Sequence, residues 1–266
     1  MKQDFSKDMS YGDYLNLNKL LSLQTPLSDH HDEMLFIIIH HASELWIKLA
    51  EHELAAAMKD IENDNVEQAL KKLSRISRIQ ENLIQSWSIL STLTPADYLE
   101  FRDDLGNSSG FQSYGYRSLE FMLGNKNEKM LNVHKHDKEV YAKLKTILDA
   151  PSVYELVLQK LSQHFPIDDE VINRDFSKPY VANESVLNAW MKVYQESEKY
   201  WQFYAIAEKL VDIEDTFQNW RFRHLSTVKR IIGFKTGTGG SSGVGFLEKA
   251  LEINFFPELF DVRTEL

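Results

Sequence analysis

The sequence contains no cysteine, and this absence limits the chemistry that the chain can perform. Without thiols it can form neither disulfides nor iron–sulfur clusters, and it has no thiolate nucleophile. A chain without disulfides fits a reducing compartment, so we expect a cytoplasmic protein.

Long apolar runs are also missing. The longest aliphatic run covers residues 34–39, far short of the ~20 residues that span a bilayer. The N-terminus is too polar for a signal peptide. The formal net charge is −10, which argues against nucleic acid or an anionic membrane as the main partner. We therefore expect a soluble protein that binds neither.

Sustained alternation of polar and apolar residues, the pattern of a half-buried strand, is absent from the sequence. Apolar residues recur at helical spacing instead. Hydrophobic residues make up 43% of the chain, which is enough for a sizeable core. The sequence therefore predicts an all-α fold, with one domain of long packed helices over residues 1–266 and a helical arm over residues 1–23.

Capping signals divide the chain into predicted helices. Ser10 with Asp13, and Thr94 with Pro95, mark two helix starts. Residues 125–183 are polar and broken by prolines, so short peripheral helices and loops are expected there. The predicted helices cover residues 10–23, 28–63 (capped by Ser28 or Asp29), 66–90, the segment after Thr94, 111–123, one or two within 184–232, and 244–253.

A histidine on an apolar helical face, followed by a glycine-rich loop, is the feature around which the chain is organised. Six of the 11 glycines lie between Gly233 and Gly245, where backbone N–H groups can approach a ligand closely. On their own, these features also fit a structural core histidine and a flexible linker. The apolar stripe consists of Phe217, Trp220, His224, Val228 and Ile231.

Five of the nine histidines lie between His30 and His52. His30 and His31 begin a predicted helix, where they could bind a metal or simply remain solvated at the helix start. His40 differs, because Phe36 lies one turn before it on the same face. The pair could line a flat cavity, although core packing explains it equally well.

Tyr98 and Arg102 form another pair four residues apart. An arginine beside a tyrosine can hold a carboxylate in a bidentate fork. The alternative is a surface ion pair with a nearby acid such as Asp103.

Three segments together resemble one family. HHDEMLFIIIHHASELW, TPADYLEFRDDLGNSSGFQSYGYRSLEF and WRFRHLSTVKRIIGFKTGTGGSSGVGFL are similar to the signature segments of tryptophan 2,3-dioxygenase, a haem enzyme, and above all to those of its bacterial members. The resemblance covers residues 11–263 and is weakest over residues 125–183. It implies oxidation of L-tryptophan by O2 to N-formylkynurenine, the first step of the kynurenine pathway.

The resemblance also implies a role for individual residues. His224 corresponds to the axial ligand of the iron in haem b, one per subunit and ferrous in the active form. His40 corresponds to the catalytic histidine that meets the indole N–H, and Arg102 to the arginine that binds the substrate carboxylate. The other matched positions are Phe36, Tyr98, Gly237 and Thr238 around the substrate, and Ser109 and Tyr116 around the haem.

The same resemblance implies a homotetramer. The N-terminal helix of each subunit would reach a neighbour's active site, where Tyr11, Tyr14 and Leu15 would contribute. A short helix of this kind is marginal on its own and needs a surface on which to pack.

Two positions depart from the family pattern. His41 replaces a glutamine after the distal histidine, and Tyr114-Gly115 replaces a Leu-Gln pair. Neither is a matched contact residue, so we expect activity to be retained, with a changed pocket shape near Tyr116.

The competing interpretations of the whole chain are a non-haem metal enzyme and a helical ligand-binding or sensor protein.

Overall fold

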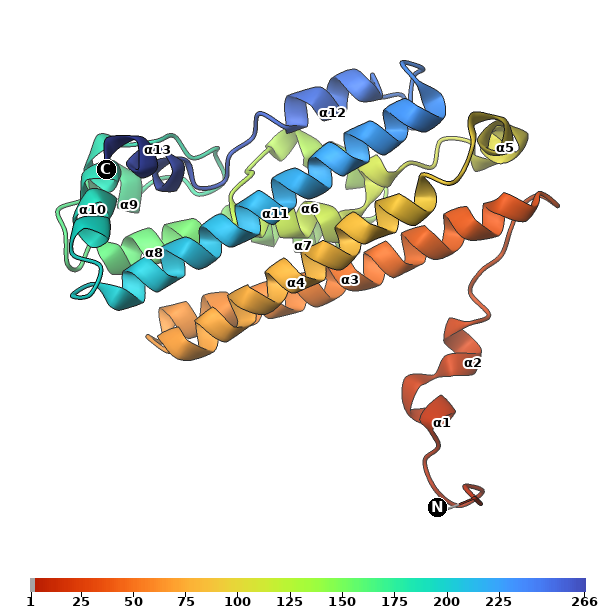
Figure 1. Ribbon diagram of the computed structural model, residues 1–266, viewed down its shortest axis with the longest axis horizontal. Coiled ribbons are helices and arrows are strands. Elements are labelled where there is room, and N and C mark those ends of the chain that lie inside the picture. The colour runs from red at the N-terminus through yellow and green to blue at the C-terminus, as the bar shows by residue number, and fades with distance from the viewer. Residues whose placement is uncertain (1–2) are drawn as a thin grey trace.

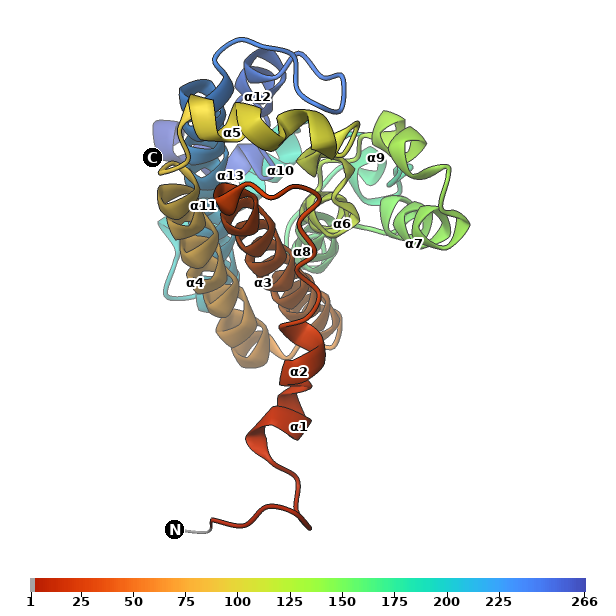
Figure 2. The same cartoon turned by 90° about the vertical axis from the view of Figure 1, so that its right-hand side faces the viewer.

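Three long helices lie lengthwise against one another in the computed structural model, which describes residues 3–266 (Figures 1 and 2). They are α3 (His31–Glu62), α4 (Val66–Leu90) and α11 (Trp201–Ile232). Each presents an apolar stripe to the others. Ala50 and Ala57 of α3 and Ala69 of α4 are completely buried, and these small side chains allow the helix backbones to approach closely.

The remaining elements are also helical, and residues 3–266 contain no strand, which confirms the predicted all-α fold. No helix in this range is long and apolar enough to cross a membrane. The remaining elements are α1 (Tyr11–Leu15), α2 (Leu17–Leu20), α5 (Pro95–Phe101), η1 (Arg102–Leu105), η2 (Gly110–Gln112), α6 (Tyr114–Leu123), η3 (Glu128–His134), α7 (Lys138–Asp149), α8 (Val153–Leu161), α9 (Asp169–Ile172), α10 (Glu184–Gln195), α12 (Val244–Ala250) and α13 (Pro257–Glu265).

The predicted helix over residues 10–23 is interrupted in the structure. Ser10 and Asp13 form the expected capping box, but Asn16 has a φ of 50° and separates α1 from α2. Asparagine tolerates this left-handed conformation better than most residues do. The prediction of one continuous helix was therefore wrong.

The start of α3 also differs from the prediction. Its N-cap is His30, without a side-chain capping bond, rather than Ser28 or Asp29. Ser28 instead donates its hydroxyl to Glu33, and the same carboxylate accepts the backbone N–H groups of Leu27 and Ser28 at 2.8 Å. The buried Glu33 thus fixes the turn before α3 in place of a conventional cap.

The middle of the chain was predicted to be peripheral, but part of it lies in the core. Helix α8 is buried along most of its length, with Val153, Val157 and Leu161 in the main hydrophobic cluster. Ser152 and Glu155 form a capping box at its start. The C-terminal tail also forms a helix, α13, which packs against α10.

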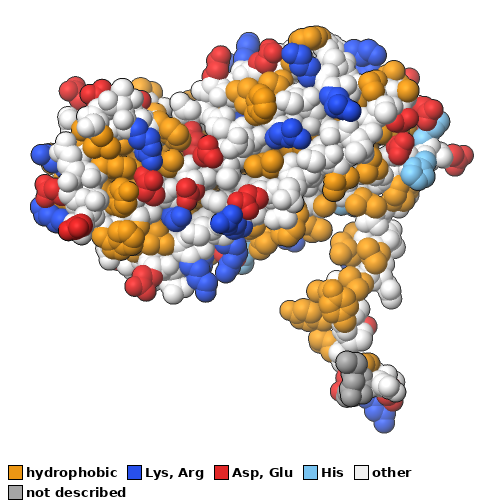
Figure 3. Space-filling view, in the orientation of Figure 1, with side chains coloured by type: hydrophobic (Ala, Val, Ile, Leu, Met, Phe, Trp, Pro, Cys, Tyr) orange, Lys and Arg blue, Asp and Glu red, His pale blue; other side chains and the backbone are white. Residues whose placement is uncertain are grey.

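The N-terminal arm extends away from the helical body (Figures 1 and 2). Its side chains are largely exposed, 75% for Tyr11 and 72% for Tyr14. Hydrophobic side chains gather along it in the space-filling view (Figure 3). Directly after the arm, the Gln24 side-chain amide contacts His41 Nδ1 at 3.2 Å, so one of the two departures from the family pattern contacts the residue that follows the arm.

Helix α5, at one end of the bundle, begins with a strong helix-start signal. The Asp97 backbone N–H donates to the Thr94 hydroxyl at 3.3 Å, and the Thr94 backbone N–H donates to the Asp97 carboxylate at 3.0 Å. Pro95 occupies the first turn, where its missing N–H costs nothing. This reciprocal cap fixes the direction of the helix that carries Tyr98.

Thr94→Ala tests how far this cap stabilises the α5 end. The substitution leaves backbone N–H groups of the first turn without their acceptor, so we expect the free energy of unfolding to fall by about 1 kcal/mol. Chemical denaturation measures this change. Thr92→Ala is the control, because its hydroxyl donates to the Ile89 carbonyl and caps no helix start. Equal losses in the two variants would contradict the capping role.

Candidate active site

His224 lies on the half-buried face of α11 against two indole rings, which also contact each other. Its imidazole is stacked on Trp87 of α4, with ring centroids 4.4 Å apart and planes at 10°. Trp220 lies on its own helix, with centroids 5.4 Å apart. Burial, together with the positive charge that His40 can carry, lowers the pKa of His224 to about 4. The imidazole is therefore neutral at physiological pH and has a lone pair available.

His40 on α3 has a defined tautomer. Its Nδ1 lies 2.7 Å from the backbone carbonyl of Phe36. A carbonyl can only accept, so Nδ1 carries the proton and Nε2 of the neutral ring is left as an acceptor. Burial lowers the pKa of His40, which favours this neutral form. The ring therefore offers one hydrogen-bond acceptor in a fixed orientation.

An aromatic wall surrounds His40. The Phe36 ring lies 4.2 Å from the His40 ring and 5.9 Å from Tyr98 of α5, centroid to centroid. Phe101, completely buried, packs edge-on against both Phe36 and Tyr98. Helical spacing paired Phe36 with His40, whereas only the resemblance placed Tyr98 near the same substrate.

Arg102 is next to this wall and reaches the glycine-rich loop. One of its terminal nitrogens donates to the Thr236 carbonyl at 2.7 Å. Its Nε is buried without a hydrogen-bond partner within residues 3–266. No ion pair with Asp103 forms among the described residues, so the surface ion-pair alternative is not the arrangement found. A cavity of about 260 Å³ is lined by Arg102, Asp103, Gly106, Thr236, Gly237 and Thr238.

The loop is held against the segment that precedes α6. The Thr238 hydroxyl donates to the Ser108 carbonyl at 2.6 Å. Gly239 lies so close to Ser109 that a β-carbon on Gly239 would be 2.7 Å from the serine Cβ. The glycine-rich segment is therefore a packed wall of the cavity, and the linker interpretation is wrong.

Tyr116 packs against Trp220 and Phe217 of α11. Its ring centroid is 5.2 Å from that of Trp220, and its hydroxyl donates to Glu120 at 2.8 Å. The same buried carboxylate pairs with Arg117 and Arg221. Burial, followed by the charge of Glu120, raises the pKa of Tyr116. Tyr116 is thus a neutral hydrogen-bond donor with a fixed ring.

The second departure from the family pattern lies beside Tyr116. A β-carbon on Gly115 would lie 3.2 Å from Ile47 Cγ2 and 3.3 Å from a Glu44 carboxylate oxygen of α3. Glycine at this position therefore lets α6 approach α3 more closely than a larger side chain would. The changed pocket shape expected near Tyr116 stays a prediction.

The side chains available as ligands decide what kind of metal group could bind at His224. Among residues 3–266, no cluster of three or more histidine, aspartate or glutamate side chains could hold a metal ion. The described residues also offer no hydrogen-bond partner to the His224 ring nitrogens. A single neutral imidazole beside flat aromatic rings suits axial ligation of a planar metal complex.

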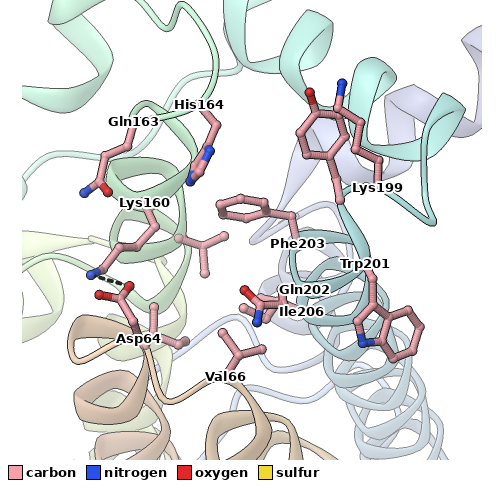
Figure 4. Close-up of a pocket in the computed structure, with 13 residues that line it drawn as sticks. Asp64, Val66, Lys160, Gln163, His164, Lys199, Trp201, Gln202, Phe203 and Ile206 are labelled. Atoms are coloured by element: carbon pink, nitrogen blue, oxygen red, sulfur yellow. Dashed lines mark hydrogen bonds and ion pairs between the residues drawn. The ribbon is translucent and has the colours of Figure 1, made fainter.

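A second cavity, of about 300 Å³, lies between the ends of α4, α8 and α11 at the opposite end of the bundle (Figure 4). Its two lysines are already paired, since Lys160 donates to Asp64 at 2.7 Å and Lys199 donates to Glu196 at 2.8 Å. Neither His40 nor His224 lines it. Among the described residues it is lined by His164 but by no arginine, so it lacks the free guanidinium of the cavity at the other end.

Most of the predicted site residues converge, but the arm residues do not. Tyr11, Tyr14 and Leu15 lie on the projecting arm, away from His40 and Arg102 of the same chain (Figure 2). Their predicted role in a neighbour's site stays a prediction. The contact of Trp87 with His224 was not predicted, because the two residues lie on different helices and no local sequence pattern pairs them.

Fold and site together define an all-α protein with two neutral imidazoles, an aromatic wall and an arginine-lined cavity at one end of its bundle. Residues 1–151 and 147–266 match the sequence model of the family described as Tryptophan 2,3-dioxygenase. The chain belongs to the tryptophan 2,3-dioxygenase family.

Individual relatives agree with this assignment. The chain is 58% identical over 264 residues to the tryptophan 2,3-dioxygenase of Shewanella woodyi, an alignment that covers 99% of this chain and 92% of the relative. It is 58% identical to the enzyme of Serratia proteamaculans and 55% identical to that of Bacillus thuringiensis, in each case over 99% of this chain and 95% of the relative.

Gly239→Ala tests the packing of the loop on Ser109. The added methyl group cannot fit at 2.7 Å from the serine Cβ, so we expect the loop to open. Trypsin should then cleave after the exposed Lys235 about tenfold faster than in the unaltered chain. Gly110→Ala is the matched control, since a β-carbon there meets nothing within 4 Å. Unchanged cleavage in Gly239→Ala would contradict the packing.

Proposed function

We propose that this chain is a haem-dependent dioxygenase that converts L-tryptophan and O2 into N-formylkynurenine, the first step of tryptophan degradation. Family membership gives the reaction. The observation that carries the proposal is the juxtaposition, at one end of the bundle, of a neutral His224 imidazole, His40 with a free Nε2, and an arginine-lined cavity.

His224 is the proposed axial ligand of the haem iron. The haem, one per subunit and ferrous in the active form, supplies the binding and activation of O2. His224 suits this role because its ring is neutral and has no protein partner among residues 3–266. Trp87 and Trp220 supply flat apolar surface beside it, and Tyr116 packs against Trp220. Ser109, which lies against the glycine-rich loop, and Tyr116 would line the haem pocket.

Arg102 is proposed to bind the substrate carboxylate. Its unpartnered Nε and its position in the cavity leave donors for a bidentate contact. A buried carboxylate without such a partner would be costly, so Arg102 selects for a free amino acid. Tyr98 extends the same surface, and Gly237 and Thr238 on the facing loop would contact the ammonium and carboxylate groups.

His40 and Phe36 are proposed to orient the indole. Since Nδ1 of His40 is occupied by the Phe36 carbonyl, Nε2 would accept the indole N–H while the Phe36 ring packs on the indole. An indole N–H is far too weak an acid for imidazole to deprotonate outright. His40 therefore positions the substrate for attack at the C2–C3 bond and does not act as an obligatory base.

The arm is proposed to complete the site of another subunit. Its exposed aromatic and aliphatic side chains need a surface on which to pack. In the proposed homotetramer, Tyr11, Tyr14 and Leu15 of one chain cover the substrate pocket of the next. The charge of −10 and the small polar substrate fit a cytoplasmic enzyme without nucleic-acid or membrane partners.

The experiment that tests the function starts from anaerobically reduced, purified protein. Addition of L-tryptophan and O2 should produce the near-ultraviolet absorbance of N-formylkynurenine, and the protein should have a haem Soret band. His224→Ala is the control, which should fold but hold haem weakly. A wild-type protein without a Soret band would favour a non-haem enzyme or a binding protein, and full haem occupancy in the variant would exclude His224 as ligand.

Arg102→Ala should weaken selection for the carboxylate. Loss of a charge-assisted contact in a desolvated site should cost about 2–5 kcal/mol in kcat/KM for L-tryptophan. Arg102→Lys should also be poor, because an ammonium group cannot reproduce the fork. Tryptamine, which lacks the carboxylate, is the comparison substrate. If Arg102→Ala reduced kcat/KM equally for both substrates, the carboxylate role would be wrong.

Deletion of residues 1–23 should leave the haem-binding body intact and raise KM for tryptophan at least about tenfold. Co-expression of this truncated chain with full-length His224→Ala tests whether the arm acts between subunits. His224→Ala alone should be inactive and the truncated chain alone should be weakly active at low tryptophan, but the variant can lend its arm to the truncated chain's haem site. Hybrids confirmed by native mass spectrometry should recover part of the activity; hybrids that stay inactive would rule out the shared site.

A further inference from the structure

The orientation of His224 has no hydrogen-bonded support within the described chain. Metal-ligating histidines usually donate their second ring N–H to a carboxylate or a backbone carbonyl, and this bond fixes the ring plane. No such acceptor contacts His224 among residues 3–266. The contacts that the structure gives this ring are with two indoles, Trp87 and Trp220.

The two indole contacts differ in what they can fix. Trp220 is tilted by 47° to the imidazole and comes from the same helix, one turn earlier. Trp87 is almost parallel to the imidazole, at 10° and 4.4 Å, and comes from α4. A face-to-face contact from a separate helix restricts rotation of the imidazole about its χ2 bond. The plane of the ring thus depends on how α4 packs against α11.

Trp87 carries a cost that an apolar residue would not. Its indole Nε1 is buried and has no hydrogen-bond partner within residues 3–266, and a buried unpaired donor destabilises the folded state. Trp87 packs against a cluster that includes Ile39, Leu90 and Leu93. Leucine or phenylalanine at position 87 could pack against the same cluster without burying an unpaired donor. The property that distinguishes Trp87 from these residues is therefore the broad flat face of its indole ring.

We propose that Trp87 is the positioning residue for the haem ligand, and that parallel stacking of its indole on His224 sets the plane of the axial imidazole. The proposal rests on the proposed function, because it requires that His224 bind the haem iron. A stacked indole orients the ring without adding charge, whereas a carboxylate partner would give it imidazolate character. The chain thereby keeps a neutral axial ligand in one orientation.

Trp87→Leu removes the flat face, and Trp87→Phe keeps a smaller one. Trp201→Leu and Trp201→Phe are the matched controls, because Trp201 is 60% exposed and lies at the opposite end of α11. Resonance Raman spectra of the ferrous proteins should show a broadened or shifted iron–histidine stretching band in Trp87→Leu and an intermediate one in Trp87→Phe. Haem transfer to apomyoglobin should be about three- to tenfold faster in Trp87→Leu.

Circular dichroism and thermal melting of each variant separate positioning from general destabilisation. A folded Trp87→Leu whose band and haem-transfer rate equal those of Trp201→Leu would overturn the proposal. If Trp87→Leu fails to fold, Trp87→Phe decides by the same comparison with Trp201→Phe. Wild-type protein that binds no haem would instead refute the proposed function, and the positioning role with it.

Discussion

The close packing of α4 between α3 and α11 is the interaction on which the rest of the structure depends. Buried alanines and aliphatic residues along these helices bring their axes together over most of their length. Because the three helices are long, their registers are fixed by many contacts at once. His40 of α3, Trp87 of α4 and His224 of α11 therefore meet at one end without any local sequence signal for their meeting.

The buried charges beside the site follow one pattern. Glu120 accepts from Tyr116, Arg117 and Arg221, and the Arg221 guanidinium also lies over the Phe217 and Phe255 rings, 4.8 Å from each centroid. Removing Glu120 would leave two guanidinium groups without a carboxylate in the interior, which is costly. This network fixes the Tyr116 ring, which packs against Trp220 beside His224. The cavity beside Arg102 stays open to a ligand.

Sequence patterns predicted the features of the fold that depend on residues close together in the chain. It gave the bounds of α4 and, through the capping box of Thr94, the start of α5, because both are encoded by neighbouring residues. It missed the break at Asn16 and the burial of α8, since the first depends on a single backbone conformation and the second on partners distant in sequence. The resemblance supplied most of the site residues, but the pairing of Trp87 with His224 required the tertiary structure.

The contact between Arg102 and the Thr236 carbonyl joins positions 134 residues apart. During synthesis the helices that carry His40 and Arg102 leave the ribosome long before the loop that faces them. A nascent chain can therefore bury much of its core while its ligand cavity still lacks one side. Closure of the pocket is one of the last events of synthesis, and a ribosome that stalls before Thr236 leaves a helical body with no complete site.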